Sequence, residues 1–451
     1  MQHTHLLGAL AWLGASHAVW AQCVPAWDTT IGEIGLTSDG YAGPMALYND
    51  GRGEALYIGG SFSSAGGLTT RGIARYSQAG QWGAVGGGCY STNTNYFVAA
   101  LAAHDFAGVR ELVSGGGFAT AGNVAGTANL ASWNGTRWRP LGAPDGAVWS
   151  ILSHNGMLYA AGGFQNIGGV AASGIAVYNG TSWSPLGAGM SGGFSPCTFV
   201  MKVFNDGSGE KLYAGGRFGS MGGINGLVAR WNGSAWQTVG RGVIGSNTFS
   251  GIESMAIFND GSGNALYVGG YDIRPVGGIT RNVAKWNGTA WTTVGQYLGG
   301  RTTALAVFDD GSGPALFAAG TAQPDIAYVA RLVGSQWVTL SGGVGQDGGP
   351  PWPSAFGLLP WQGKLYVAGD FDYVGTNQAP AFGLAAWTSC TEACPADFNR
   401  DGFVDFFDYL GFVGCFEGEG CPPGATADFD GDGFVDFFDL SAFTAAFEEG
   451  C

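Results

Sequence analysis

The chain has 451 residues, and its composition already excludes several classes of protein. Glycine accounts for 84 residues and tryptophan for 16, while only 11% of the residues are charged. So much glycine disfavours a helical protein, since glycine inside a helix costs roughly 1 kcal/mol relative to alanine. A hydrophobic content of 46% is enough to build a core, which excludes a disordered chain.

The net charge of −15 is concentrated at one end of the chain. Residues 391–451 hold 14 acidic side chains and one basic side chain, Arg400, for a net of −13, which leaves −2 for residues 1–390. A nearly neutral main part without a basic stripe argues against nucleic acid as a partner.

Residues 1–21 have the pattern of a secretory signal peptide. An apolar stretch from Leu6 to Ala15 precedes Val19 and Ala21, which are small at the −3 and −1 positions of a cleavage site. The apolar run is shorter than the ~20 residues that span a membrane, and no later stretch reaches that length. We therefore expect a secreted or cell-surface protein without a membrane span in the mature chain. Its eight cysteines are expected to form disulfides.

A unit recurs seven times over residues 24–387, a span of 364 residues that divides into 52 residues per unit. Each unit reads as four short strands. The first strand is apolar, the second ends on a diglycine, and an Asn-Gly hairpin joins the third to a fourth that starts with Trp. The diglycine positions are Gly59-Gly60, Gly115-Gly116, Gly162-Gly163, Gly215-Gly216 and Gly269-Gly270, with Ala319-Gly320 and Ala368-Gly369 as degenerate copies. Four-stranded units of this length predict a mainly β chain folded as a seven-bladed β-propeller.

The seventh unit stops after Trp387 and lacks a fourth strand. A matching strand occurs at the other end of the chain, at Trp27. We therefore predict that this N-terminal strand completes the last blade and closes the ring. Cys23 and Cys390 flank the broken turn, so we also predict a Cys23–Cys390 disulfide that staples the closure.

These landmarks resemble the kelch repeat, a propeller family that also includes the central domain of galactose oxidase, over residues 24–388. The resemblance implies a fold and leaves the role open among binding platform, enzyme and structural part. Two histidines follow the signal peptide, His104 and His154, and we expect both to be solvated hairpin residues. No catalytic set is visible, so we expect no enzyme. The Asn-Gly-Thr/Ser turns at Asn134, Asn179, Asn232 and Asn287 match the glycosylation sequon, but turn chemistry explains them better.

The loops that lead from one unit to the next carry aromatic residues suited to a sugar or peptide ligand. They are Tyr90, Tyr96, Phe97, Trp149, Phe194, Phe249 and Trp352. Ordinary loop packing explains them equally well. Cys89 and Cys197 lie in the same set of loops and are candidates for a disulfide.

Residues 391–451 carry two copies of a calcium-binding loop, 31 residues apart. Oxygen ligands fall at loop positions 1, 3, 5, 7, 9 and 12, and a glycine at position 6 allows the sharp turn. The predicted ligands of the two ions are Asp397, Asn399, Asp401, the Phe403 carbonyl, Asp405 and Asp408 in the first loop, and Asp428, Asp430, Asp432, the Phe434 carbonyl, Asp436 and Asp439 in the second. Helices are expected over 406–416 and 437–447.

Both loops end in Asp where the EF-hand has Glu, and this departure resembles dockerin modules. The resemblance implies two bound Ca²⁺ ions and a cohesin-like or other cell-surface anchoring partner. Loop positions 10 and 11, which often govern partner choice in dockerins, are Phe-Phe in both copies. The flanking cysteines resemble a cysteine-framed bacterial variant. Among the three pairings that four cysteines allow, we take Cys394–Cys415 with Cys421–Cys451 as the expectation.

The sequence thus predicts a signal peptide (1–21), a kelch-like propeller (22–390) and a small all-α, dockerin-like calcium module (391–451). The favoured function is binding or display at the surface of a bacterium. The alternative is a carbohydrate-active enzyme, a polysaccharide lyase, glycosidase or oxidase, whose site is built from propeller loops.

Overall fold

The computed structural model describes residues 25–28, 31, 40–92, 96–193, 195–321, 329–346, 353–388, 396, 398, 406–418, 420–421, 426–429 and 433–449. The chain is mainly β with two helices near its C-terminus, as the sequence predicts. It forms two compact units. Residues 26–309 and 313–388 make up the first, called the ring unit here, and residues 389–451 belong to the second, the C-terminal module. The predicted signal peptide (1–21), Cys23 and Cys390 lie outside the described residues, so both the signal peptide and the Cys23–Cys390 bridge stay predictions.

Within the described residues, seven four-stranded antiparallel sheets follow one another along the chain. The first four, given from the inside of the ring outward, are β2 (Ala42–Asn49), β3 (Glu54–Gly60), β6 (Ile73–Ser77) and β7 (Trp82–Ala84); β9 (Phe97–Phe106), β10 (Val109–Gly117), β12 (Leu130–Trp133) and β13 (Trp138–Pro140); β14 (Val148–His154), β15 (Met157–Gly162), β18 (Ile175–Tyr178) and β19 (Trp183–Pro185); β21 (Cys197–Asn205), β22 (Glu210–Arg217), β25 (Val228–Trp231) and β26 (Trp236–Thr238). The last three are β28 (Gly251–Asn259), β29 (Asn264–Tyr271), β31 (Val283–Trp286) and β32 (Trp291–Thr293); β33 (Thr302–Asp309), β34 (Pro314–Gly320), β35 (Val329–Val333) and β36 (Gln336–Thr339); β38 (Ser354–Trp361), β39 (Lys364–Asp370), β42 (Leu384–Thr388) and β1 (Ala26–Asp28).

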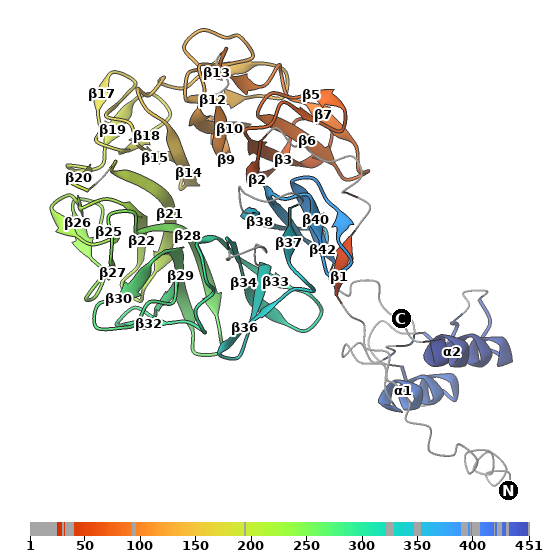
Figure 1. Ribbon diagram of the computed structural model, residues 1–451. Helices are drawn as coiled ribbons and strands as arrows, with labels where there is room; N and C mark the ends of the chain where they lie inside the picture. The colour runs from red at the N-terminus through yellow and green to blue at the C-terminus, as the bar shows by residue number, and fades with distance from the viewer. Residues whose placement is uncertain are drawn as a thin grey trace, which may run out of the picture. The chain divides into compact units, whose positions relative to one another are not determined.

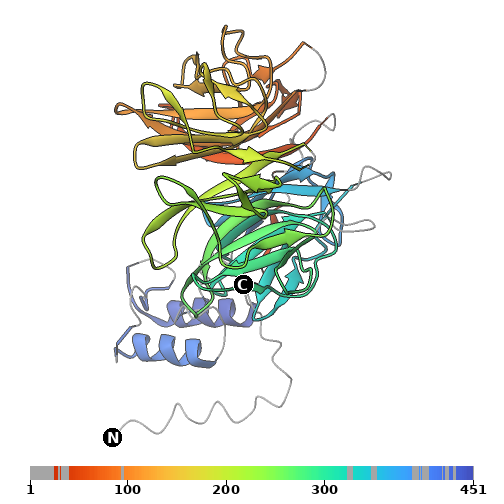
Figure 2. The ribbon, with the colours of Figure 1, turned by 90° about the vertical axis from the view of Figure 1, so that its left-hand side faces the viewer.

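The sheets lie around a closed ring in chain order (Figure 1). The first strand of each sheet contacts the first strands of the two neighbouring sheets, and β38 of the seventh sheet contacts β2 of the first. The side view shows the strands of the second and third sheets, in orange and yellow, next to each other (Figure 2). Most of the buried hydrophobic residues fill the spaces between neighbouring sheets.

The ring closes where the two ends of the unit meet in one sheet. The predicted pairing of Trp27 with Trp387 is confirmed, since β1 pairs antiparallel with β42 in this register. The two indole rings lie edge to face, with centroids 5.3 Å apart. Lys364 Nζ lies 2.7 Å from Asp28 Oδ2, which adds an ion pair between β39 and the N-terminal strand.

Short strands outside the seven sheets connect neighbours around the ring. β8 (Cys89–Tyr90) follows the first sheet and pairs with β11 (Thr120–Ala121) of the second. The other short pairs are β20 (Met190–Ser191) with β23 (Ser220–Met221) and β24 (Ile224–Asn225), β27 (Val243–Gly245) with β30 (Ile273–Pro275), β37 (Val344–Gly345) with β40 (Tyr373–Val374) and β41 (Ala379–Pro380), and, inside single repeats, β4 (Ser64–Ala65) with β5 (Leu68–Thr69) and β16 (Asn166–Ile167) with β17 (Val170–Ala171). Tryptophans add to these connections, since the indole of Trp236 donates to the Leu186 carbonyl of the preceding sheet at 2.9 Å.

The diglycine is explained by two close approaches of other residues. A Cβ on Gly216 would lie 2.1 Å from the Cys197 carbonyl oxygen on the first strand of the same sheet. A Cβ on Gly215 would lie 2.7 Å from Ile252 of the next sheet. The missing side chains therefore let both neighbours approach.

In the third repeat the sequence assigns the diglycine one residue too late. Gly162 is the residue whose Cβ would meet a carbonyl oxygen, that of Ala147, at 2.1 Å. Nothing lies within 4 Å of a Cβ on Gly163. The equivalent pair is therefore Ala161-Gly162, which matches the Ala-Gly pairs of the sixth and seventh repeats.

The hairpin between the first and second strands repeats an aspartate that holds the sheet together. In the fourth sheet, Asp206 accepts a hydrogen bond from Tyr213 at 2.8 Å and pairs with Arg230. The same arrangement joins Asp50, Tyr57 and Arg75 in the first sheet and Asp260, Tyr267 and Lys285 in the fifth. Each of these hairpins is therefore held by a tyrosine and a cation of its own sheet.

We expect the stability of the ring unit to fall as the pH drops from about 5 to 2. Burial alone would raise the pKa of Asp206, but hydrogen bonds from Ser208 and Tyr213 and the charge of Arg230 bring it below its usual value. A depressed carboxyl pKa adds stability above the unfolded pKa near ~3.9, and acid removes it. Asp206→Asn should lower the free energy of unfolding by about 2 kcal/mol at pH 7. In urea melts, the variant should also lose less stability than wild type as the pH falls. The control is Asp105→Asn, at a 58% exposed side chain, and equal slopes in wild type and Asp206→Asn would contradict the account.

The C-terminal module contains helix α1 (Phe406–Phe416) and helix α2 (Phe437–Glu449), close to the predicted bounds. Phe412 of α1 stacks on Phe443 of α2 with ring centroids 4.1 Å apart. Phe398, Cys415 and Ala427 complete the small buried cluster.

Candidate functional site

Each innermost strand of the ring carries a β-bulge near its start. The pairing between the first and second strands of every sheet slips at this point, opposite the diglycine or its Ala-Gly equivalent. Bulges of this kind leave a residue unpaired and turn its side chain in a new direction. The unpaired residues are Gly43 and Pro44, Ala99, Trp149, Phe199, Glu253, Thr303 and Phe356.

All of these bulge residues line one cavity of 590 Å³ at the centre of the ring unit. Tyr41, Val98, Arg217, Arg301, Thr321 and Ser354 complete its wall. The volume falls in the range of roughly 300–1,000 Å³ that is typical of small-molecule sites. Seven sheets therefore contribute to a single concave surface, and its chemistry differs from one side to the other.

One side of the cavity is aromatic. The ring centroids of Trp149 and Phe199 lie 5.7 Å apart in an edge-to-face arrangement, and Phe97 packs behind Trp149 at 4.9 Å. Tyr41 and Phe356 form a second edge-to-face pair at 5.2 Å. Burial raises the pKa of Tyr41 to about 12, so its hydroxyl stays protonated at neutral pH.

The other side of the cavity is charged. The guanidinium of Arg301 meets the Glu253 carboxylate with two nitrogens, at 3.0 Å for Nε to Oε1 and 2.5 Å for Nη2 to Oε1. The Glu253 side chain is 11% exposed. Burial raises the pKa of Glu253, and the positive charges of Arg301 and Arg217 oppose this rise only in part.

The predicted loop aromatics are brought together in part. Trp149 lines the cavity and Phe97 supports it, whereas Tyr96 donates a hydrogen bond to the Phe62 carbonyl as a packing residue. Phe249 is 55% exposed, and the Tyr90 hydroxyl donates a hydrogen bond to the Asn123 amide oxygen. Phe194 and Trp352 lie outside the described residues.

Sequence reasoning missed the other aromatic and charged residues of the cavity, Tyr41, Phe199, Arg217, Glu253, Arg301 and Phe356. A signal for half of them existed, because the bulge lies opposite each diglycine and its residue can be located from that landmark.

The expectation of two solvated histidines is wrong for His104. The residue is 1% exposed, its Nδ1 lies 2.8 Å from Ser153 Oγ, and its ring packs edge-on against Phe106. Burial lowers the pKa of His104 and keeps the ring neutral. His154 is partly exposed beside Glu210, at 3.3 Å. Neither histidine lines the central cavity.

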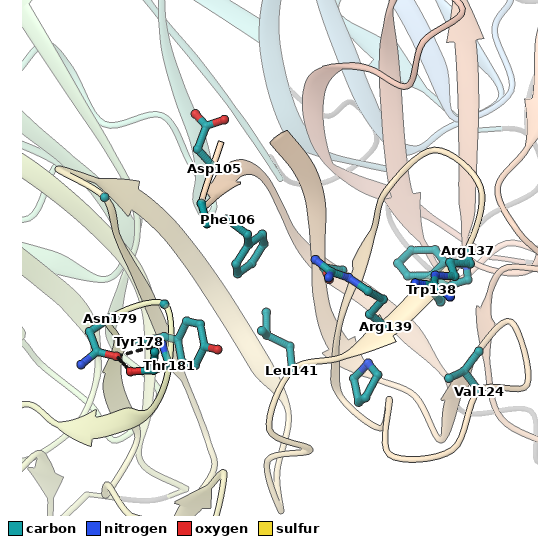
Figure 3. A pocket seen from close by; sticks show the side chains of 15 residues that line it. Asp105, Phe106, Val124, Arg137, Trp138, Arg139, Leu141, Tyr178, Asn179 and Thr181 are labelled. Carbon is teal, nitrogen blue, oxygen red and sulfur yellow. Dashed lines mark hydrogen bonds between the residues drawn. The ribbon is translucent and has the colours of Figure 1, made fainter. Parts of the chain in front are cut away.

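A second hollow, a groove of 1000 Å³, lies between the second and third sheets (Figure 3). Phe106, Arg139 and Tyr178 line it. One of its charged groups is engaged within the protein, since Arg139 pairs with the buried Glu111. On the opposite wall of the groove, the Asn179 amide oxygen accepts hydrogen bonds from the amide and the hydroxyl of Thr181, marked by dashed lines in Figure 3. We take the central cavity as the candidate site, because all seven sheets contribute residues to it.

The side chains of the sequon asparagines stabilise their own turns by hydrogen bonds, as predicted. The amide oxygen of Asn179 accepts from the Thr181 amide at 3.0 Å, the Thr181 hydroxyl at 2.8 Å and the Ser182 amide at 2.9 Å. Asn134, Asn232 and Asn287 make the same contacts in their own repeats.

Five of the twelve predicted calcium ligands lie in the described part of the C-terminal module. Asp408 and Asp439, the last ligands of the two loops, are fully buried carboxylates. Asp439 accepts hydrogen bonds from the Phe429 amide at 2.6 Å and the Asp436 amide at 2.7 Å. Asp428 Oδ1 is buried without a hydrogen-bond partner. Phe434 is exposed, with its carbonyl next to the Gly433 turn.

Buried carboxylates and an unpartnered buried oxygen are the donors that a hard cation such as Ca²⁺ takes, so these residues fit the ion. The other seven predicted ligands, Asp397, Asn399, Asp401, Phe403, Asp405, Asp430 and Asp432, lie outside the described residues. No group of three or more His, Cys, Asp or Glu that could hold a metal occurs among the residues described.

The expected cysteine pairing of the C-terminal module is wrong. Cys415 bonds to Cys421, six residues further on, rather than to Cys394. The reason is local. Helix α1 ends at Phe416, and Gly418 with a φ of 80° turns the chain, so the Cα atoms of the two cysteines lie 4.4 Å apart. Cys394 and Cys451 lie outside the described residues.

Cys89 and Cys197 do not pair, contrary to expectation. Both are buried in the ring unit, and Cys89 lies 3.6 Å from Ser114 Oγ. Burial raises the pKa of each thiol to about 12, so neither is a reactive thiolate at neutral pH.

The C-terminal module exposes an apolar surface at the start of both helices. Phe406, Phe407, Phe437 and Phe438 are 53%, 67%, 72% and 67% exposed. Each pair occupies loop positions 10 and 11 of its repeat. Exposed phenylalanines in such number are typical of an interaction surface.

No protein-family model matches the chain, and no curated protein matches it. Similar solved structures include a computationally designed protein, with 13% identity, 73% of this chain and 81% of that chain covered, and a TM-score of 0.40. An extracellular domain of a one-component system from B. thetaiotaomicron has 12% identity, 81% of this chain and 40% of its own chain covered, and a TM-score of 0.47. A chain of the mitotic checkpoint complex has 13% identity, 84% of this chain and 98% of its own chain covered, and a TM-score of 0.43. All three TM-scores are below 0.5.

Among the described residues, no helix has the length and apolar character needed to cross a membrane.

Proposed function

We propose that this protein is an exported, kelch-like seven-bladed propeller that binds a glycan in its central cavity and is tethered to a bacterial surface by its C-terminal module. The ring of seven four-stranded sheets and the shared strand of the seventh sheet support the propeller. The apolar residues 6–15 and the cleavage pattern at Ala21 support export.

The observation that carries the binding proposal is the placement of one bulge residue, or two, from every sheet around one cavity. Aromatic side chains such as Trp149 and Phe199 offer flat apolar surfaces to the C–H face of a sugar ring. Glu253 and Arg301 offer an acceptor and donors for its hydroxyl groups. A sugar needs both kinds of contact, and the cavity holds them within one small volume.

We propose that the C-terminal module binds two Ca²⁺ ions and docks onto a cohesin-like or other surface partner. The buried carboxylates of Asp408 and Asp439 and the buried Oδ1 atom of Asp428 support the ion sites. When bound, Ca²⁺ would join the two loop ends to the helices through these carboxylates. The exposed Phe406-Phe407 and Phe437-Phe438 pairs support an apolar docking surface.

A glycan array followed by calorimetric titration of the strongest glycan tests the cavity. Trp149→Ala should weaken binding at least about tenfold, because it removes a central aromatic contact. Phe249→Ala is the matched control, since Phe249 is an exposed loop aromatic outside the cavity lining. Equal affinities for wild type and Trp149→Ala, with melting temperatures unchanged, would refute the cavity as the binding site.

Glu253 supports the alternative of a carbohydrate-active enzyme. A buried carboxyl whose pKa is raised can serve as a general acid. Release of new reducing ends or unsaturated ends from a bound polysaccharide, lost in Glu253→Gln, would favour the enzyme. Binding without release would favour display.

A further inference from the structure

The central cavity carries an excess of positive charge in a unit that is otherwise close to neutral. Arg217, Arg301 and Glu253 lie on its wall, which gives a formal charge of +1. Residues 1–390 as a whole carry −2. The positive charge is therefore a local property of the cavity.

The two arginines are engaged differently. Arg301 is paired with Glu253 through both Nε and Nη2. Arg217 is the last residue of β22, and its Nε donates a long hydrogen bond of 3.4 Å to the Ser195 carbonyl. Among the ion pairs of the described residues, none involves Arg217. Its charge lowers the pKa of Glu253 at longer range, behind the larger effects of burial and of Arg301.

An aromatic contact holds Arg217 beside the aromatic side of the cavity, which includes Trp149 and Phe199. Its guanidinium carbon lies 5.7 Å from the ring centroid of Phe199. The same ring meets Trp149 edge to face at 5.7 Å. A guanidinium that rests on an aromatic face keeps its planar fork of donors in a defined position.

We propose that the cavity selects a sugar that carries a carboxylate, a uronic acid residue of an acidic polysaccharide, and that Arg217 pairs with this carboxylate. This inference rests on the proposed glycan-binding function. Arginine binds carboxylates with two parallel hydrogen bonds. Arg217 and Trp149 both contact Phe199 and therefore lie close together. In this proposal a single sugar residue stacks on Trp149 and presents its carboxylate to Arg217. Arg301, already neutralised by Glu253, contacts hydroxyl groups.

The test is a calorimetric titration with trimers of galacturonate, glucuronate and mannuronate. Each trimer is paired with its carboxyl-reduced form, which keeps linkage and ring but replaces the carboxylate by an alcohol. The full mature chain is used as wild type, Arg217→Gln, Arg217→Lys and Arg110→Gln. Arg110 is the matched control, since it lies on the exposed β9–β10 hairpin with a 59% exposed side chain and pairs with Asp105. Melting temperatures check that each variant is folded.

We expect at least one acidic trimer to bind wild type about 10- to 100-fold more tightly than its reduced form. Arg217→Gln should abolish this preference, Arg217→Lys should keep part of it, and Arg110→Gln should leave it unchanged. Equal binding of acidic and reduced forms overturns the inference and leaves the glycan-binding proposal intact. If only neutral glycans bind, the inference is likewise overturned and the glycan-binding proposal stays intact. Absence of binding to any glycan, acidic or neutral, overturns both.

Discussion

Gly162→Ala should lower the free energy of unfolding of the ring unit by about 3 kcal/mol, whereas Gly163→Ala, one residue on, should change it by less than about 0.5 kcal/mol. The new methyl carbon at position 162 would lie 2.1 Å from the Ala147 carbonyl oxygen, so the bulged strand must move. At position 163 the methyl group meets nothing within 4 Å.

Urea melts of the two variants measure this difference, because each keeps its backbone amide and differs only in where the same methyl group is placed. Gly216→Ala, in the fourth sheet, should behave like Gly162→Ala, since its Cβ would also lie 2.1 Å from a carbonyl oxygen. Equal stabilities of the Gly162 and Gly163 variants would show that the second-strand glycine does not hold the bulge, and would undermine the geometry of the cavity.

Removal of calcium should destabilise the C-terminal module and leave the ring unit unchanged. If two ions bind, a free concentration a thousand times the dissociation constant contributes about 4 kcal/mol per ion. Heating the full chain with calcium and with EDTA should therefore shift the transition of the C-terminal module and leave that of the ring unit in place. Metal analysis after dialysis should give two calcium ions per chain.

Asp439→Asn should reduce the calcium stoichiometry from two to one. Asp439 is a buried carboxylate at the last position of the second loop. Glu417→Gln is the control, because Glu417 is exposed in the same module and is not a predicted ligand. A chain that holds no calcium, or melts identically with and without EDTA, would exclude the calcium module.

The arrangement of strands could be predicted from the sequence because each strand carries its own local landmark. The Asn-Gly hairpin acts within one repeat, whereas the diglycine and the fourth-strand tryptophan also contact a neighbouring sheet. All three can be recognised because they recur at fixed places in the repeat. The closing strand at Trp27 followed from the missing strand after Trp387, and the structure pairs these residues.

The cavity could not be predicted in full because it is built from residues that lie in seven different sheets. Glu253 and Arg301 are 48 residues apart, and nothing in the chain between them indicates that they meet. His104 was misassigned because its burial comes from the neighbouring sheet, through Ser153. The Cys415–Cys421 bond depends on where α1 ends and how Gly418 turns, which cysteine spacing does not encode.

The position of a bound glycan in a crystal of the full chain tests the central claim most directly. Soaked with the strongest glycan from the array, the protein should hold a sugar ring in the 590 Å³ cavity, against Trp149 and within hydrogen-bond distance of Arg301 or Glu253. A sugar bound instead in the groove of Phe106, Arg139 and Tyr178, with the central cavity empty, would contradict the account.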